Sequence, residues 1–171
     1  MKSVYLGLGS NIGDSQGHIS LGLQALQAHP QISLISVSRL YRTRPIGPMQ
    51  DDYLNCAALI RTMLEPEALL DVCQEIEQRN GRERNERWGP RTLDIDLLVW
   101  SSVNLETDRL TLPHPRAQER LFVLAPLLDL PEAHTIHLAG EALTTHAERC
   151  DPNDVRLTSL IWNGEALQET T

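Results

Sequence analysis

The chain has 171 residues and a formal net charge of −8 at neutral pH, and 41% of its residues are hydrophobic. This is the size of one ordinary domain with a core, so we expect a single domain over residues 1–171. The acidic balance argues against a nucleic-acid-binding domain, which would present a basic face. No apolar run approaches the ~20 residues of a membrane-spanning helix. The N-terminus lacks a basic-then-apolar signal segment, so we expect a cytoplasmic protein.

Arginine carries almost all of the positive charge. Lys2 is the only lysine beside fourteen arginines, which excludes a phosphate-binding loop of the form GxxxxGK[ST]. If the protein binds phosphate, arginine must therefore supply the positive charge, and its planar fork suits bidentate contact with phosphate oxygens. Five arginines fall within thirteen residues, namely Arg79, Arg82, Arg84, Arg87 and Arg91. The three cysteines form no CxxC pair, so neither a disulfide framework nor a zinc site is predicted.

The first part of the chain predicts a strand, a helix and two further strands. Residues 3–9 form a short buried strand, and residues 14–29 carry apolar side chains at helical spacing until Pro30 closes the helix. Residues 32–43 alternate apolar and polar side chains as one half-buried strand does. A loop rich in Pro, Gly and Asp follows over 44–52, and the next residues, to about 64, predict another strand.

The second part predicts a helix, a strand, a hairpin arm and a short helix. Pro66 suits a first helical position and Gly81 stands where a C-terminal cap belongs. Residues 92–100 predict a strand after the arginine-rich loop, with the hairpin arm and the short helix behind it. The order β-α-β-β-α-β predicts an α+β fold with a ferredoxin-like antiparallel sheet and helices packed on one face. Residues 150–171 read as a polar C-terminal extension without an assigned role, which we expect Trp162 to anchor.

Two aspartates, Asp94 and Asp96, stand one residue apart in the strand after the arginine-rich loop. Successive side chains of a strand alternate faces, so both carboxylates point to one side, with their Cα atoms roughly 6.5–7 Å apart. A solvated strand face or a salt bridge with Arg91 would explain such a pair. Two Mg²⁺ ions would also remove the repulsion, because Mg²⁺ takes one or two carboxylates and completes its octahedron with phosphate oxygens and waters. With the arginine run upstream, the pair predicts a nucleotide-phosphate site.

The few aromatic residues point to a second ligand. Aromatic side chains make up only 4% of the chain, and Tyr53, Trp88 and Phe122 stand beside polar residues at element ends. Side chains in such places suit stacking against a flat heteroaromatic ring. Asn55 shares the strand face of Tyr53 and could hydrogen-bond the edge of that ring through its amide.

The stretch RWGPRTLDIDLL resembles the signature of the 6-hydroxymethyl-7,8-dihydropterin pyrophosphokinases, which are enzymes of folate biosynthesis. The likeness extends to GLGSN, YRTRPIGP, DYLNCA, EQRNGRER and LPHPRAQERLFVLAPL, in the family's order up to about residue 130. It implies a monomeric ferredoxin-like enzyme. Such an enzyme uses Mg²⁺ to transfer the β,γ-pyrophosphoryl unit of ATP to the hydroxymethyl group of the pterin, and releases AMP. Its partners would be these two small molecules, with no nucleic acid and no membrane.

The resemblance also implies a role for individual positions. Asp94 and Asp96 would bind two magnesium ions, and Arg82 and Arg91 would contact the transferring phosphates. The pterin slot would be formed by Tyr53, Asn55, Trp88 and Phe122, joined by backbone groups of Thr43, Arg44 and Ile46, and Trp88 would also be a lid over the pterin. The residues around ATP would be Gln74, Glu77, Arg82, Arg84, Arg91, Arg109, Thr111, His114 and Arg120. The chain departs from the family pattern at Arg44, where a small residue or proline is expected.

Several alternatives stay open at this point. The general base would be Asp96 or a metal-activated hydroxyl of the substrate, while His114 between two prolines favours contact with ATP. The loops 43–52 and 81–91 would close over the site after ATP binds. A ferredoxin-like domain that binds a small ligand or RNA is a rival interpretation, and so is a phosphotransferase with another acceptor.

Overall fold

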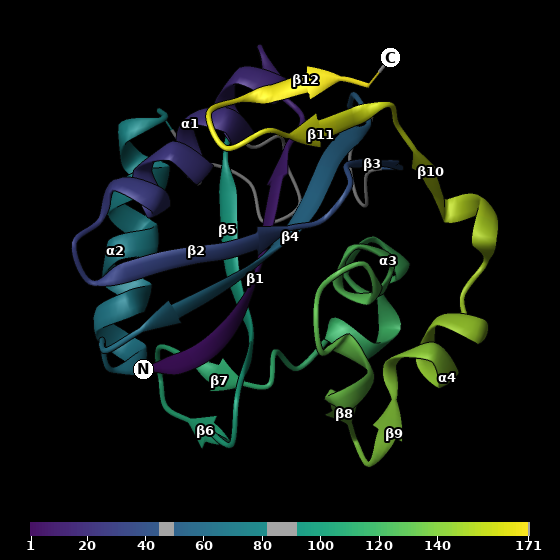
Figure 1. Ribbon diagram of the computed structural model, residues 1–171. Helices are drawn as coiled ribbons and strands as arrows, with labels where there is room; N and C mark the ends of the chain where they lie inside the picture. Colours follow the sequence, from purple (N-terminus) through teal and green to yellow (C-terminus); the bar gives the residue numbers. More distant parts are fainter. Residues whose placement is uncertain (45–49, 82–91, 171) are drawn as a thin grey trace.

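The computed structural model describes residues 1–44, 50–81 and 92–170. An antiparallel six-stranded sheet lies at its centre (Figure 1), with the strand order β10-β3-β4-β1-β5 and with β2 pairing β4 as well. Its strands are β1 (Lys2–Ser10), β2 (Ile32–Val37), β3 (Tyr41–Thr43), β4 (Tyr53–Thr62), β5 (Asp94–Trp100) and β10 (Val155–Leu157). The strands at 3–9, 53–64 and 92–100 are thereby confirmed.

Helices cover both faces of this sheet. α1 (Ser15–Ala28) and α2 (Pro66–Arg79) lie on one face, as predicted, while α3 (Leu121–Leu128) and α4 (Leu143–Glu148) lie on the other (Figure 1). The expectation of helices on one face only is therefore wrong for the complete chain. Asp14 caps α1 through a hydrogen bond from the backbone N–H of Gly17 at 3.0 Å. Gly81 follows α2 with a φ of +74°, a conformation that suits glycine at a helix C-terminus.

The sheet divides the hydrophobic interior into two cores. Val4, Leu6 and Leu8 of β1 belong to the first core, which lies under α1 and α2. Tyr5 of the same strand, with Leu98 of β5, belongs to the second core, which lies under α3 and α4. Because successive residues of a strand alternate faces, a central strand that is covered on both sides is buried along most of its length.

The strand predicted over residues 32–43 is interrupted. It consists of β2 and β3, which pair different parts of β4 on the same side. Between them Ser38 continues the contact with β4: its backbone N–H donates to the Ala57 carbonyl, and its hydroxyl accepts the Ala57 N–H, each at 2.8 Å. The hydroxyl thus takes a place that a backbone carbonyl occupies in a regular ladder.

Short elements complete the described chain. The predicted hairpin is confirmed as β6 (Leu105–Glu106) and β7 (Thr111–Leu112). The helix expected after it consists of a 3₁₀ turn followed by α3. The remaining short elements are η1 (Ala117–Glu119), η2 (Ala133–Thr135), β8 (His137–Leu138), β9 (Glu141–Ala142), η3 (Pro152–Asp154), β11 (Leu160–Trp162) and β12 (Leu167–Glu169).

The C-terminal segment, expected to be a polar extension, is an integral part of the fold. β10 adds a strand to the sheet beside β3, and the β11–β12 hairpin packs on α1 (Figure 1). Leu160 and Leu167 are buried in the first core, and Trp162 packs against it as expected. Three glutamines of α1 donate side-chain hydrogen bonds to backbone carbonyls of the hairpin, namely Gln16, Gln24 and Gln27.

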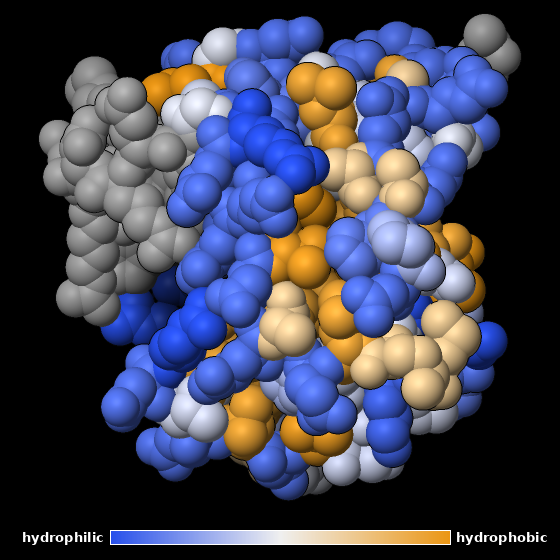
Figure 2. Space-filling view, turned by 90° about the vertical axis from the view of Figure 1, so that its left-hand side faces the viewer, coloured by the Kyte–Doolittle hydropathy of each residue, from blue (hydrophilic) through white to orange (hydrophobic). Residues whose placement is uncertain are grey.

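The surface is mostly hydrophilic on the side where α1 and α2 lie. Hydrophobic atoms form a narrow, broken band on this face (Figure 2). Among the described residues, the large hydrophobic side chains that are exposed come from separate elements, such as Leu21 of α1, Ile35 of β2 and Leu157 of β10. Within the part of the chain that the structure describes, no helix is long and apolar enough to cross a membrane.

Candidate functional site

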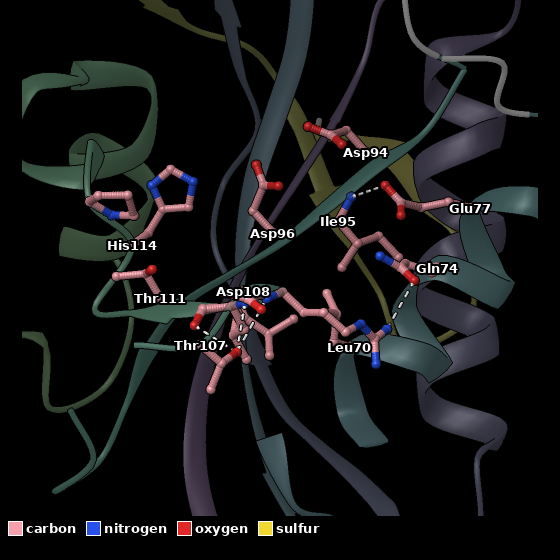
Figure 3. Close-up of a pocket in the computed structure, with 14 residues that line it drawn as sticks. Leu70, Gln74, Glu77, Asp94, Ile95, Asp96, Thr107, Asp108, Thr111 and His114 are labelled. Atoms are coloured by element: carbon pink, nitrogen blue, oxygen red, sulfur yellow. Dashed lines mark hydrogen bonds between the residues drawn. The ribbon is translucent and has the colours of Figure 1, made fainter. Parts of the chain in front are cut away.

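A pocket of about 340 Å³ lies at the outer edge of β5, the last strand of the sheet. Its walls are α2 on one side and the segment 107–115, with the β6–β7 hairpin, on the other (Figure 3). The pocket brings together seven residues that the sequence assigned to nucleotide or metal, namely Gln74, Glu77, Asp94, Asp96, Arg109, Thr111 and His114. These residues are spread over 41 positions of the chain and meet because β5 lies between α2 and the hairpin.

The two aspartates occupy the centre of this site. Both side chains are half-buried and line the pocket, between Glu77 on one side and His114 on the other (Figure 3). Ile95, between them in the chain, is buried in the core under α1 and α2. The predicted alternation of β5 is therefore confirmed at these positions, and the strand presents two carboxylates at an accessible edge.

Glu77 fixes β5 at the residue between the aspartates. Its side chain on α2 is only 2% exposed, and its Oε2 accepts the backbone N–H of Ile95 at 3.1 Å. β5 is the outer strand here, so a carboxylate from the helix satisfies a backbone donor that a neighbouring strand would otherwise pair. Burial raises the pKa of the Cys73 thiol, one turn earlier on α2, and the nearby charges of Glu77 and Asp96 raise it further.

The hairpin wall of the pocket is tied to α2 by polar contacts. The Arg109 guanidinium donates to Asp71 at 2.5 Å and to the Gln74 Oε1 at 3.4 Å. The Thr107 hydroxyl donates to Glu67 at 2.9 Å. Arg109 therefore reaches the pocket from the hairpin while it also holds the hairpin against the helix.

Positive charge approaches the aspartates from the segment after the hairpin. The backbone N–H of His114 donates to the Leu98 carbonyl at 2.8 Å, which places this segment beside β5. Burial lowers the pKa of His114, the charge of Arg120 lowers it further, and Asp94 opposes them. Burial and then Arg116 lower the pKa of Arg120, whereas Asp96 and Asp94 raise it. His114 thus favours its neutral form at pH 7, while Arg120 stays cationic near both carboxylates.

A polar patch of the sheet adjoins the aspartates. Asn55 of β4 and Asp94 of β5 both pair with Gly9 of β1, one from each side. Asn55 is buried, and its Nδ2 donates to the Thr43 hydroxyl at 2.7 Å. The half-buried Tyr53 pairs with Thr43. Tyr53 and Asn55, two of the residues expected to hold the ring, therefore lie on the same sheet face as the two aspartates, with Gly9 between Asn55 and Asp94.

Sequence reasoning missed Gly9 as part of this patch. A Cβ atom at this position would lie 2.7 Å from the Asn55 Oδ1, closer than real contacts allow. Gly7, two residues earlier, pairs with Asp96 and has the Leu98 side chain close by. The available signal was the GLG pattern at alternate positions, which leaves one face of the strand bare.

The structure places only some of the other predicted site residues. Phe122, at the start of α3, is half-buried against the second core, and its ring centroid lies 5.5 Å from the Arg120 guanidinium. Arg44 is exposed after the end of β3. The remaining predicted site residues lie outside the described part of the chain, namely Ile46, Arg82, Arg84, Trp88 and Arg91.

The oxygen donors at this pocket fit a hard cation whose remaining ligands are phosphate oxygens and water. Within residues 1–44, 50–81 and 92–170, no three histidine, cysteine, aspartate or glutamate side chains gather into a metal site. Asp94 and Asp96 present two neighbouring carboxylates at the pocket, whose lining also contains Glu77 and Asp108. Mg²⁺ suits such an incomplete set, because it takes one or two carboxylates with phosphate oxygens and waters.

Comparison with known proteins gives a consistent match. The family model described as 7,8-dihydro-6-hydroxymethylpterin-pyrophosphokinase (HPPK) matches residues 5–132. Two relatives carry the name 2-amino-4-hydroxy-6-hydroxymethyldihydropteridine pyrophosphokinase. The protein of Bacillus subtilis is 46% identical over 127 residues, which cover 74% of this chain and 76% of the relative. The protein of Methylorubrum extorquens is 42% identical over 156 residues, which cover 91% of this chain and 98% of the relative.

Solved structures of similar fold are longer proteins. An HPPK-DHPS from Plasmodium falciparum matches with a TM-score of 0.69 and 12% identity, over 98% of this chain and 49% of that chain. A crystal structure of HPPK-DHPS in complex with substrates matches with a TM-score of 0.66 and 13% identity, over 98% and 48%. The chain thus spans about half the length of these structures, and at such low identity the likeness concerns the fold alone.

Proposed function

Because the chain belongs to the 7,8-dihydro-6-hydroxymethylpterin-pyrophosphokinase family, we propose that it transfers pyrophosphate from ATP to the hydroxyl of 6-hydroxymethyl-7,8-dihydropterin. The products are the pterin diphosphate and AMP. The enzyme is a 2-amino-4-hydroxy-6-hydroxymethyldihydropteridine pyrophosphokinase of folate biosynthesis. One observation carries the proposal: Gly9 pairs with Asp94 on one side and Asn55 on the other, so that a metal-bound triphosphate and a flat ring can meet on one sheet face.

Asp94 and Asp96 are the proposed ligands of two Mg²⁺ ions. Both carboxylates line the pocket, and each ion would keep sites for phosphate oxygens and waters. When bound, the ions would neutralise the negative charge of the triphosphate near the bonds that change. The charge of Arg120 interacts with both aspartates, and we propose that Arg120 contacts the phosphates. Outside the described residues, Arg82, Arg84 and Arg91 are proposed for the same task.

ATP and the pterin are proposed to occupy the two adjoining regions. The pocket between α2 and the hairpin would take ATP, with contacts from Gln74, Glu77, Arg109, Thr111 and His114. The patch around Thr43, Tyr53 and Asn55 would take the pterin, together with Arg44, Ile46, Trp88 and Phe122. Support for the second assignment comes from the buried amide of Asn55, which is held at the edge of this patch by Thr43.

Catalysis would depend on position and charge. The hydroxyl oxygen of the pterin attacks the β-phosphorus of ATP in line and gives its proton to Asp96 or, if a bound metal ion activates the hydroxyl, to water. The bond from this phosphorus to the α–β bridging oxygen breaks, and AMP leaves with that oxygen. The sheet face would hold the acceptor next to the carboxylates that hold the donor, which replaces a bimolecular encounter with a fixed geometry. The neutral form favoured by His114 suits hydrogen bonds to ATP rather than an ion pair with its phosphates.

The finer description of the fold also belongs to the proposal. We assign the unit from β1 to β5 to the ferredoxin-like class, because β1 lies between β4 and β5, with β2 and β3 on the far side of β4. We further propose a monomer, since the exposed large hydrophobic side chains of the described residues come from separate elements. The single domain over 1–171 and the cytoplasmic location stay predictions.

One incubation tests the proposed function. The enzyme is mixed with Mg–ATP and 6-hydroxymethyl-7,8-dihydropterin, and the nucleotide products are separated. AMP is expected; ADP would indicate a kinase with another transfer, and neither product would indicate a binding module. Asp96→Asn should lower turnover by about 10³-fold, the scale for removal of an electrostatic group. Asp154→Asn, at an exposed position in η3, is the matched control.

A further inference from the structure

We infer that Thr43 and Gly9 set the orientation of the Asn55 amide, so that its oxygen faces the ligand patch and accepts an N–H of the bound ring. The inference rests on the proposed function and deepens it, because it makes Thr43 and Gly9 positioning residues that select the edge of the ring. It assigns to Thr43 a task of its side chain, whereas the resemblance implied only backbone contact.

A hydrogen bond joins the side chains of Asn55 and Thr43. The Asn55 Nδ2 donates to the Thr43 Oγ1 at 2.7 Å, and the two residues are 8% and 4% exposed. A buried amide that loses a partner carries the full desolvation penalty of that group. In the structure this hydrogen bond places the nitrogen of the amide toward β3 and its oxygen on the opposite side.

The absence of a side chain at Gly9 leaves space for the Asn55 oxygen. The Asn55 Oδ1 lies so close over this residue that a Cβ atom would stand 2.7 Å from it. Gly9 pairs with Asp94 on its other side. The oxygen of the amide therefore lies over β1, between the strand of Asn55 and the strand of the aspartates. The bare backbone of glycine permits this position, and any side chain would oppose it.

Thr43 is itself fixed in the sheet by strands on both sides. β3 is three residues long and pairs with β4 on one side and with β10 on the other. Thr43 lies opposite Tyr53 in one ladder and opposite Val155 in the other. A β-branched side chain has few rotamers in a strand, so the hydroxyl has a defined place. The C-terminal strand thereby contributes to the position of a ligand-facing amide.

The chemistry of the ring follows from this orientation. An amide oxygen accepts hydrogen bonds and cannot donate them. A ring that turns an N–H toward the patch is favoured, and a ring that turns a carbonyl or an unprotonated nitrogen to the same point is rejected. The reduced pterin offers N–H groups along its edge, whereas a rotated amide would present the wrong partner to them.

Three substitutions and a double-mutant cycle test the inference. The pterin is titrated calorimetrically into enzyme that is saturated with Mg²⁺ and a non-hydrolysable ATP analogue. Thr43→Val, which keeps the shape and removes the hydroxyl, should weaken pterin binding by about 2- to 10-fold, the scale of one hydrogen bond. Thr43→Ser should restore most of that loss. In an Asn55→Ala background, Thr43→Val should have no further effect, because its action runs through the amide.

Gly9→Ala provides an independent test of how the Asn55 amide is oriented. Its methyl group should displace the Asn55 oxygen and weaken the pterin, and the loss should be smaller in the Asn55→Ala background, where the obstacle is absent. Thr144→Val, at an exposed position on α4, is the control. Wild-type affinity in Thr43→Val, or an equal loss with and without Asn55, would overturn the inference.

The failure of the proposed function would look different. If the wild-type enzyme neither binds the pterin nor forms AMP, the function is wrong. If it does both and the Thr43 variants bind alike, only the orientation by Thr43 is wrong. Affinity for the ATP analogue, measured in the same variants, should stay at the wild-type value, because β3 does not line the nucleotide pocket.

Discussion

The carboxylate of Glu77 gives the sharpest prediction about how the site is held together. It lies on α2, is 2% exposed, and accepts the N–H of Ile95 between the two aspartates. Glu77→Ala removes the acceptor, leaves a buried donor on the outer strand without it, and opens a small void. Glu77→Gln keeps an oxygen acceptor of the same length but removes the charge.

The expected size follows from these contacts. A hydrogen bond to a charged group contributes about 1.5–3 kcal/mol, and an unsatisfied buried N–H costs about 1–3 kcal/mol. These figures describe overlapping parts of one loss, so Glu77→Ala should lower the free energy of unfolding by about 2–4 kcal/mol. Glu77→Gln should lower it by about 1 kcal/mol, because a neutral acceptor replaces a charged one.

Urea unfolding followed by circular dichroism measures both values. Glu75→Ala is the matched control, since Glu75 lies on the same helix with a 60% exposed side chain in a surface pair with Arg79. It should change stability by no more than about 0.5 kcal/mol. Affinity for Mg–ATP should fall in Glu77→Ala and less in Glu77→Gln. Wild-type stability in Glu77→Ala would refute the reasoning that Glu77 holds β5.

Two further predictions concern pH and the C-terminal segment. Burial and Arg120 lower the pKa of His114 in the folded state, so below pH ~6.5 the unfolded chain binds a proton that the folded chain resists. Stability should therefore fall from pH 7.5 to 5.5, and urea unfolding should show a smaller fall in His114→Gln; equal slopes would contradict this. Leu167→Ala should cost about 2–4 kcal/mol because Leu167 is 5% exposed in the first core, whereas Leu157→Ala, at 49% exposure, should cost little. Equal and small losses in both variants would show that the hairpin is an appendage after all.

Most elements of the sheet and its first helical layer could be predicted from local patterns. The helix over 66–79 has a proline at its start and a glycine after its end, and the strand at β5 alternates carboxylates with core residues. The second helical layer was missed because the β-α-β-β-α-β order describes only the first one. The continuous burial of Leu54–Ile60 in β4 is the pattern of a strand that is covered on both faces.

The C-terminal segment gave no comparable signal. Its core contacts come from isolated residues such as Leu160 and Leu167 in an otherwise polar stretch. Three of its polar contacts join glutamine side chains of α1 to backbone carbonyls, about 140 to 150 residues apart in the chain. Neither kind of contact produces a periodic pattern, so no local rule indicates that this segment packs on α1 or adds a strand beside β3.

The candidate site also has a part that a local pattern could predict and a part that depends on tertiary packing. Asp94 and Asp96 could be predicted because the alternation of one strand places them together. The place of Gly9 depends on the registers of two strand pairs, which join it to Asn55 and to Asp94 across distant parts of the chain. The contact of Glu77 with the backbone of Ile95 could not be predicted for the same reason, because it depends on how α2 packs along β5.

The central claim is that Asp94 and Asp96 together hold the metal ions of the bound nucleotide. Mn²⁺ in place of Mg²⁺ allows bound ions to be counted by electron paramagnetic resonance, in the presence of a non-hydrolysable ATP analogue and the pterin. We predict two bound ions per wild-type chain and the loss of at least one in Asp94→Asn and in Asp96→Asn. An unchanged count of ions, with unchanged affinity, in both variants would contradict it.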